Sequence, residues 1–300
     1  MSTLAEKILM VRPANFGFNP QTAESNAFQQ QSDLDPAEVS RLATAEFDQM
    51  VRRLNELNVE LAVIEESGEN YTPDSVFPNN VFSTHKGGTL CVYPMEAESR
   101  RLERSVVDDV RQHFAAERLL DLSHFEKEGK FLEGTGSLVL DQDRRIAFAC
   151  LSSRTHPDVL DAWAKEMDYE AMSFRAFDHE GREIYHTNVM MCLGDGFSVA
   201  CTDSIDDPTE RANFIDRIHQ TDRELVEISH DQMNSFAGNM LQIKDRSGRK
   251  LLLMSETARG SLKPGQISRL ESYTHLASFD INTIEQCGGG SVRCMIAELF

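Results

Sequence analysis

A unit in which two short strand-like runs precede an amphipathic helix recurs along this chain and restricts the folds that it can adopt. The runs fall in residues 131–152, 188–202 and 239–255, and a polar turn separates the two strands of each pair. The units share negligible sequence identity, but a period of about 50 to 60 residues predicts a radial or barrel-like array. The helices predicted after the three strand pairs span 157–167, 208–218 and 264–271.

The first third of the chain follows a related pattern. A strand at 7–13 is followed by a polar loop through Gln31 and by a helix that Asp35 and Pro36 open. This helix carries apolar residues on one stripe, so we expect it to be structural. The remaining predicted elements are a strand at 60–66, a hairpin at 81–94 around Gly87 and Gly88, and a charged helix from about 96 to 114.

Composition narrows the class of protein. The 300 residues are 40% hydrophobic and 26% charged, which is typical of a globular protein, and we expect one domain over 1–300. The net charge of −19 argues against nucleic acid or an anionic membrane as a partner, because both need clustered Lys and Arg. The sequence has neither an apolar run of the roughly 20 residues that span a bilayer nor a secretory signal. A cytoplasmic location is therefore expected.

The cysteines indicate reduced thiols. Six are present without a CxxC pair or a regular spacing, so neither a metal site nor disulfide bonds are predicted. Cys294 differs from the others because glycines at 288–290 and Arg293 precede it. Glycines let the backbone approach other groups, and a nearby cation and exposed N–H groups favour a thiolate. Cys294 is thus a candidate nucleophile, with a buried structural cysteine as the alternative.

Two polar positions lie where the repeat places strand ends. Glu133 is followed by Gly134 and Gly136, and His186 precedes an apolar strand. A solvated turn and a strand-edge histidine are the ordinary readings of such positions. Thiol catalysis, however, needs a proton carrier beside the sulfur and a carboxylate that orients this carrier. Glu133, His186 and Cys294, from three separate units, supply these groups.

These residues resemble a known family. The Glu133-Gly pair, His186-x-Asn188 and GGGSVRCM at 288–295 are similar to the guanidine-modifying superfamily of arginine deiminases, dimethylarginine hydrolases and amidinotransferases. MVRPANFGFNPQTAESNAFQ at 10–29 and FPNNVFSTH at 77–85 resemble its citrulline ureidase branch. The resemblance covers nearly the whole chain. It implies an α/β fold, the five-bladed α/β-propeller (pentein) of repeated small-sheet-plus-helix units, with a site at the central axis.

The resemblance also implies roles for single residues. Cys294 would be the nucleophile, His186 the general acid and base, and Glu133 the group that orients His186. PDSVFPNN at 73–80, ESRR at 98–101 and LSSRT at 151–155 resemble the family's substrate segments. Asp74 would contact the amino-acid end of the substrate or a neighbouring loop. Arg100 and Arg154 would hold the α-carboxylate, since a guanidinium matches a carboxylate bidentately. A solvated position is the alternative for both arginines.

Asn80 and Asn188 depart from relatives that act on guanidinium, in which carboxylates are typical at these places. A buried cation that faces only neutral amides lacks the partners it needs. Asparagine offers a donor and an acceptor, which suits a neutral ureido group, and Asn79 is expected to share this task. A simple turn after Pro78 is the alternative for Asn79 and Asn80. Citrulline is the natural ureido amino acid of this size.

The predicted function is therefore hydrolysis of citrulline to ornithine, ammonia and carbon dioxide through a covalent adduct on Cys294. The open alternatives are arginine deiminase-like or dimethylarginine hydrolase-like action on a guanidino substrate, amidino transfer, and an inactive amino-acid-binding module. No cofactor is expected, and the expected partner is a small amino acid, with a homodimer as the default assembly. The sequence leaves the roles of His85, His156 and Asn239 open.

Overall fold

A computed structural model describes residues 3–300. Its strands form five three-stranded sheets, and each sheet repeats the same topology. In every sheet the central strand pairs antiparallel with one outer strand, here called the first strand, and parallel with the other outer strand, which follows the helical crossover. The expected five-bladed α/β-propeller is thereby confirmed.

The N-terminal and C-terminal strands share one sheet. β1 pairs parallel with β2 and antiparallel with β15, so the end of the chain closes the ring of sheets. Helix α1, Pro36–Glu56, connects β1 to β2 and begins as predicted, with the Asp35 carboxylate accepting a hydrogen bond from the Ala37 N–H. The strands of this sheet are β15 (Ala297–Leu299), β1 (Lys7–Arg12) and β2 (Glu60–Glu65).

The other four sheets follow in chain order. Their first two strands match the predicted strand pairs, whereas their third strands were not predicted from the sequence. These sheets are β3 (Phe82–His85), β4 (Thr89–Val92) and β5 (Arg118–Asp121); β6 (Leu138–Asp141), β7 (Ile146–Cys150) and β8 (Glu170–Phe174); β9 (Met191–Leu193), β10 (Phe197–Ala200) and β11 (Glu224–Glu227); and β12 (Leu241–Lys244), β13 (Lys250–Ser255) and β14 (His275–Phe279).

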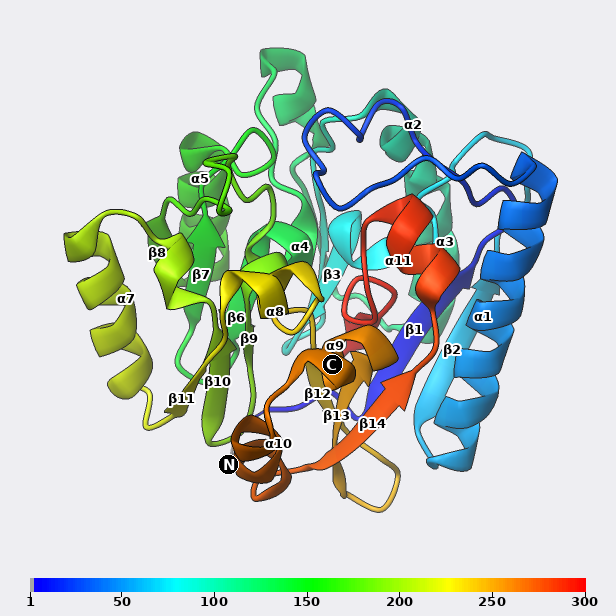
Figure 1. The fold of residues 1–300 in the computed structure, drawn as a ribbon. Coiled ribbons are helices and arrows are strands. Elements are labelled where there is room, and N and C mark those ends of the chain that lie inside the picture. The colour runs from blue at the N-terminus through cyan, green and yellow to red at the C-terminus, as the bar shows by residue number, and fades with distance from the viewer. Residues whose placement is uncertain (1–2) are drawn as a thin grey trace.

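The longer helices lie at the periphery of the ring, where α1, α5 and α7 are seen on its outer sides (Figure 1). Helices α5 and α10 have the predicted bounds, and α7 runs one residue beyond the prediction. The single helix predicted from about 96 to 114 is wrong, because a 3-10 segment interrupts it. The crossover helices are α2 (Glu98–Arg101), η2 (Leu102–Val106) and α3 (Val107–His113); α5 (Pro157–Met167); α7 (Pro208–His219); and α9 (Glu256–Ser261) and α10 (Pro264–Glu271).

The first strands of neighbouring sheets contact one another around the axis: β15 contacts β3, β6 contacts β9, and β9 contacts β12. The apolar core lies between the sheets and the outer helices, and Phe47, Phe148, Trp163 and Phe214 are among its fully buried side chains. Short segments mark the entries and exits of the strands. They are η1 (Pro78–Asn80), η3 (Ser123–Glu128), α4 (Gly134–Ser137), α6 (Thr187–Met190), η4 (Thr202–Ser204), α8 (His230–Asn234) and α11 (Asn282–Gly288).

Candidate active site

The turn that enters the first strand of each sheet brings one part of the candidate site to the axis. Because the five turns are equivalent by the repeat, residues that are far apart in the sequence converge there. The pocket at this place is covered by the segment between β1 and α1, which Figure 1 shows crossing the top of the molecule in dark blue. The pocket is lined by Thr22, Asn26, Asp74, Phe77, Asn80, Arg100, Arg154, Tyr185, His186, Cys294 and the glycines at 288–290.

Cys294 lies in this pocket and is 6% exposed. The preceding glycines pack tightly, since a Cβ on Gly290 would lie 2.8 Å from the Phe77 ring. Arg293 does not play the expected part, because its guanidinium pairs with Glu298 at 2.9 Å. The N–H donors that reach the sulfur are side-chain amides: Asn239 Nδ2 at 3.3 Å and Asn188 Nδ2 at 3.5 Å from Sγ.

Glu133 and His186 form a buried pair at the head of α4 and α6. Glu133 Oε2 lies 2.9 Å from His186 Nε2, and the other carboxylate oxygen accepts the Glu96 N–H at 3.0 Å. Burial raises the pKa of Glu133, but Arg154 and the His186 hydrogen bond outweigh it and hold this pKa well below its usual range. Burial lowers the pKa of His186 to about 4, against the opposing effect of Glu133. His186 is therefore neutral at pH 7, with Nε2–H donating to the Glu133 carboxylate.

The second ring nitrogen of His186 and the side-chain amide of Asn80 both lie beside Gly136. A Cβ on Gly136 would collide with Asn80 Nδ2 and would lie 2.7 Å from His186 Nδ1. Only a glycine therefore allows both side chains to occupy this place. Asn80 Oδ1 accepts a hydrogen bond from Arg100 at 2.7 Å, whereas Asn80 Nδ2 is buried without a partner. The Asn80 amide thus keeps one donor free beside an unprotonated imidazole nitrogen.

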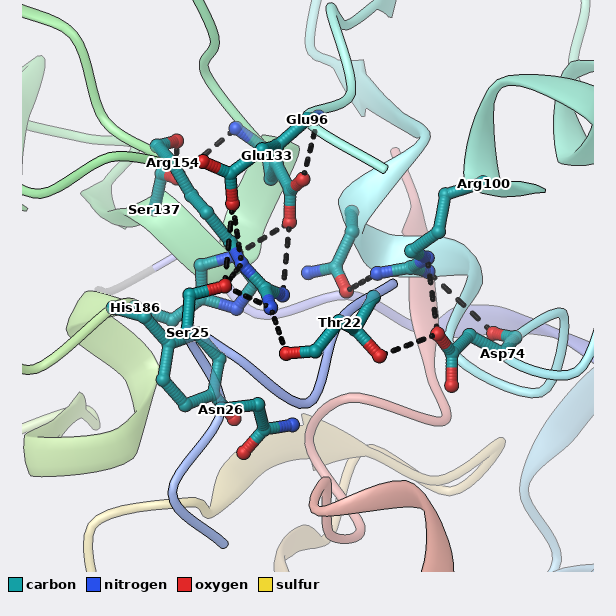
Figure 2. Close-up of polar contacts among 12 residues, drawn as sticks. Thr22, Ser25, Asn26, Asp74, Glu96, Arg100, Glu133, Ser137, Arg154 and His186 are labelled. Carbon is teal, nitrogen blue, oxygen red and sulfur yellow. Dashed lines mark hydrogen bonds and ion pairs between the residues drawn. The ribbon is translucent and has the colours of Figure 1, made fainter. Parts of the chain in front are cut away.

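Arg154 connects the Glu133–His186 pair to the covering segment. Its guanidinium lies 3.5 Å from Glu133 and 3.4 Å from Glu96, and it donates to the Thr22 carbonyl at 2.9 Å. It also lies over the Tyr185 ring, 4.7 Å from the centroid. Figure 2 shows Thr22 between Arg154 on one side and Asp74 on the other.

Arg100 and Asp74 lie on the opposite side of this close-up (Figure 2). Arg100 is 2% exposed, so the solvated position considered for it is wrong, and Glu103 holds its guanidinium at 2.9 Å. Asp74 lies 4.0 Å from Arg100 and accepts a hydrogen bond from Asn19 at 2.7 Å, while its Oδ1 is buried without a partner. Burial raises the pKa of Asp74, and Arg100 opposes this shift. The pocket thus presents two guanidinium groups and a buried carboxylate with a free acceptor.

The structure places the other candidates in different surroundings. Asn79 is buried in η1 with neither side-chain polar atom paired, but it does not line the pocket. Asn188 also lies outside the pocket lining and directs its amide at the Cys294 sulfur. His85 bonds Ser83 at 2.7 Å, and His156 caps α5, so neither belongs to the pocket. The sequence left the role of Asn239 open. Its place in FAGNML, where the chain enters a strand, was the sequence signal that could have assigned it to the site.

The site combines a thiol, a neutral imidazole that is hydrogen-bonded to a carboxylate, and amide donors. These are the groups that covalent nucleophilic catalysis requires. Residues 3–300 contain no group of three or more His, Cys, Asp or Glu side chains placed to hold a metal ion. Over the same residues, no helix is both long enough and apolar enough to cross a membrane. The six cysteines are free thiols.

Comparison with known proteins gives a consistent picture. The sequence model of a family described as N,N dimethylarginine dimethylhydrolase, eukaryotic, matches residues 12–300. No curated protein sequence matches the chain. The N-terminal domain of ArgZ, an arginine dihydrolase of the ornithine-ammonia cycle in cyanobacteria, superposes in its substrate-bound mutant form with a TM-score of 0.76. It is 16% identical, over 98% of this chain and 97% of that domain.

Two further solved structures share the fold. A mutant of AgrE bound to L-arginine superposes with a TM-score of 0.75 at 16% identity, over 98% of this chain and 40% of AgrE. A dimethylarginine dimethylaminohydrolase mutant, as its adduct with S-methyl-L-thiocitrulline, superposes with a TM-score of 0.68 at 16% identity. That alignment covers 99% of this chain and 100% of the other. At these identities the similarity shows a common fold.

Proposed function

Because this chain belongs to the N,N-dimethylarginine dimethylhydrolase family, whose members hydrolyse carbon–nitrogen bonds of guanidino compounds, we propose that it hydrolyses citrulline through a covalent adduct on Cys294. The products would be ornithine, ammonia and carbon dioxide. Family membership supports the class of reaction, hydrolysis of a non-peptide C–N bond. The ureido substrate is inferred from the groups that surround the thiol.

The observation that carries this inference is the neutral environment of the nucleophile. The Cys294 sulfur receives two amide N–H groups, from Asn188 and Asn239, and Asn80 leaves its Nδ2 unpaired beside His186. Among the described residues that line the pocket, Asp74 is the one carboxylate, and it lies beside Arg100. A guanidinium buried against amides would lack an anionic partner, whereas a ureido oxygen can accept from an amide N–H.

In the first half-reaction, His186 Nδ1 takes the proton of the Cys294 thiol, and the resulting thiolate attacks the ureido carbon and forms a carbon–sulfur bond. The carbonyl oxygen becomes an oxyanion, to which Asn80 Nδ2 can donate. The terminal nitrogen then leaves as ammonia with a proton delivered by His186, while the amino-acid chain stays attached. The resulting adduct is a thiocarbamate that joins Cys294 to the δ-nitrogen of the substrate.

In the second half-reaction, His186 takes a proton from water, which attacks the thiocarbamate carbon. The carbon–sulfur bond breaks, and the sulfur leaves as the thiolate. The released carbamate takes up a proton and decomposes to ornithine and carbon dioxide. Glu133 supports both proton transfers, because its carboxylate accepts from His186 Nε2 and stabilises the transient imidazolium.

The other end of the substrate would be held by charged groups. Arg154 and Arg100 line the pocket and suit the α-carboxylate, and the unpaired Oδ1 of Asp74 suits the α-ammonium group. In this structure Arg154 binds the Thr22 carbonyl, and Asp74 is within reach of the Thr22 hydroxyl at 3.4 Å. Substrate groups would replace these contacts with the covering segment.

A guanidino substrate is the second candidate, and the comparisons favour it. ArgZ is an arginine dihydrolase, and AgrE binds L-arginine in its solved complex. A guanidinium bound beside the thiol would need a carboxylate as its ion-pair partner. Glu133 would have to be that partner, but its carboxylate already bonds His186 and pairs with Arg154. The neutral amides around the sulfur therefore favour citrulline over arginine.

A direct assay separates the two candidates. The purified protein is offered citrulline, arginine and dimethylarginine separately, and ornithine, citrulline and ammonia are quantified, with Cys294→Ala as the blank. Ornithine and ammonia formed in equal amounts from citrulline support the proposal. Turnover of arginine with accumulation of citrulline, and no consumption of added citrulline, would establish a deiminase instead.

A further inference from the structure

Four of the five axial turns supply residues that the proposed chemistry already uses. These are Asn80 before β3, Glu133 before β6, His186 before β9 and Cys294 before β15. The fifth turn, which enters β12, carries Asn239 at the equivalent place. Because the repeat brings all five turns to the axis, Asn239 is placed among the reacting groups rather than in the outer core.

The Asn239 amide is fully engaged and 1% exposed. Its Nδ2 donates to the Asn188 carbonyl at 3.0 Å and to the Cys294 sulfur at 3.3 Å, so each of the two N–H bonds has its own acceptor. Its Oδ1 accepts the Arg293 backbone N–H at 3.1 Å. The Asn239 side chain therefore bonds to Arg293, Cys294 and Asn188. It connects the turn that carries the nucleophile to the segment that follows His186.

The turn that carries Asn239 is rigidly built. Phe236 adopts a left-handed conformation with φ of 61°, and its carbonyl accepts the Asn239 N–H at 2.8 Å. Gly238 packs directly on the next turn, since a Cβ there would collide with the Val189 carbonyl oxygen. The backbone around Asn239 is thus fixed against α6, and the direction of its amide is fixed with it.

We propose that Asn239 is a further catalytic residue, which holds the Cys294 sulfur in place and donates a hydrogen bond to its thiolate form. The inference rests on the proposed function, because it takes Cys294 as the nucleophile. A donor aimed at sulfur favours the anion that attacks and the anion that leaves when the adduct is hydrolysed. Asn188, at 3.5 Å, adds a longer contact of the same kind.

Other groups also act on the charge of this sulfur, so a test must change Asn239 alone. Tyr185 and His186, which precede α6, are two of these groups. Glu133 affects the sulfur indirectly, through its hydrogen bond with His186. The titratable and charged groups around the pocket are Asp74, Arg100, Glu133, Arg154, Tyr185, His186 and Arg293. None of these residues is itself changed in a variant at position 239.

The test is the pH dependence of iodoacetamide alkylation at Cys294, resolved from the other thiols by peptide mass spectrometry. Burial raises the pKa of Cys91, Cys150 and Cys192 to about 12, which keeps them slow. The variants are Asn239→Ala, which removes the donor, and Asn239→Asp, which replaces it with an anion of the same shape. Gln232→Glu is the matched control, because this buried amide bonds Ser261 and Gln266.

We expect Asn239→Ala to raise the alkylation midpoint by about one pH unit, as loss of a hydrogen bond to a charged group predicts. Asn239→Asp should raise it further, because a carboxylate repels the thiolate. In both variants kcat/KM for citrulline should fall at pH 7 and recover at higher pH, whereas a purely structural defect would lower it at every pH. Gln232→Glu should leave the midpoint unchanged.

The proposal is overturned if the midpoint does not move in a folded Asn239→Ala protein, or if Gln232→Glu moves it equally. Thermal unfolding checks the fold of each variant, and Asn239→Ala decides alone if Asn239→Asp does not fold. Alkylation needs no substrate, so this result is separate from the proposed function. If the alkylation midpoint is unchanged in Asn239→Ala while the unaltered protein hydrolyses citrulline, only the role of Asn239 is refuted. Turnover by Cys294→Ala refutes the covalent mechanism.

Discussion

Glu133 Oε2 and His186 Nε2 are 2.9 Å apart in a place where both side chains are almost completely buried. This contact fixes which ring nitrogen carries the proton: Nε2–H points at the carboxylate, and Nδ1, which lies with Asn80 Nδ2 beside Gly136, is left unprotonated. The two residues come from different blades, so the packing of the blades itself orients the His186 imidazole.

Removing the charge of Glu133 should therefore impair proton transfer. We expect Glu133→Gln to lower kcat for citrulline by about 10²-fold or more, with KM changed only a few-fold, because general acid–base catalysis contributes at least this much. The measurement is steady-state kinetics of Glu133→Gln, His186→Ala and the double variant. Residues that act as one unit give non-additive losses, so a fully additive double variant would contradict this relationship.

Gly136 should not tolerate a side chain. In Gly136→Ala the new methyl group must displace Asn80 Nδ2 or His186 Nδ1, so we expect at least a 10-fold loss of kcat/KM in a protein that still folds. Gly260→Ala is the matched control, because no atom lies within 4 Å of its added Cβ. In helix α9 this change should raise the free energy of unfolding by about 0.5–1 kcal/mol without loss of activity. Equal activity of the two variants would disprove the steric argument.

Substrate choice should depend on Asn80. Asn80→Asp keeps the acceptor for Arg100 but removes the unpaired N–H donor, so we expect kcat/KM for citrulline to fall by about 10²–10³-fold. The new carboxylate should instead lower KM for arginine, because a guanidinium gains an anionic partner. Kinetics with both substrates check this expectation. An unchanged preference would show that Asn80 does not contact the head group.

Stability should depend on pH through His186. Burial lowers the pKa of His186 to about 4 in the folded protein, whereas an exposed histidine has an ordinary value of about 6.5. Between these pH values the unfolded chain binds more protons, so the free energy of unfolding falls as pH falls, by up to about 3 kcal/mol from this group. Denaturant unfolding at pH 6.5 and 4.5 should show a smaller pH dependence for His186→Asn. Equal dependence in the variant and the natural protein would refute the shift.

Much of the fold was predictable because the strand pairs and proline-capped helices are local patterns. The bounds of α5 and α10 follow from proline at the first position and apolar spacing. The third strand of most sheets was missed. β5, with the sequence RLLD, and β11, with ELVE, are short and largely exposed edge strands, so they carry no alternation of apolar and polar residues. Their strand conformation comes from pairing with the preceding strand.

The convergence of the main candidate residues was predictable, but their contacts were not. Cys294, His186 and Glu133 were inferred from short motifs, and the structure brings His186 and Cys294 to one pocket with Glu133 directly behind. The direction of a side chain depends on tertiary contacts that no motif records. For this reason Arg293 was expected near the thiol but pairs with Glu298, whereas Asn239, which contacts the sulfur, remained unassigned.

The thiocarbamate that citrulline should form on Cys294 can be trapped by rapid acid quenching and detected by peptide mass spectrometry. We expect the Cys294 peptide to gain the mass of citrulline less ammonia, and we expect the adduct to be absent from Cys294→Ala and to disappear as ornithine is formed. Turnover of citrulline without any adduct on Cys294, or an adduct formed only from arginine, would contradict this expectation.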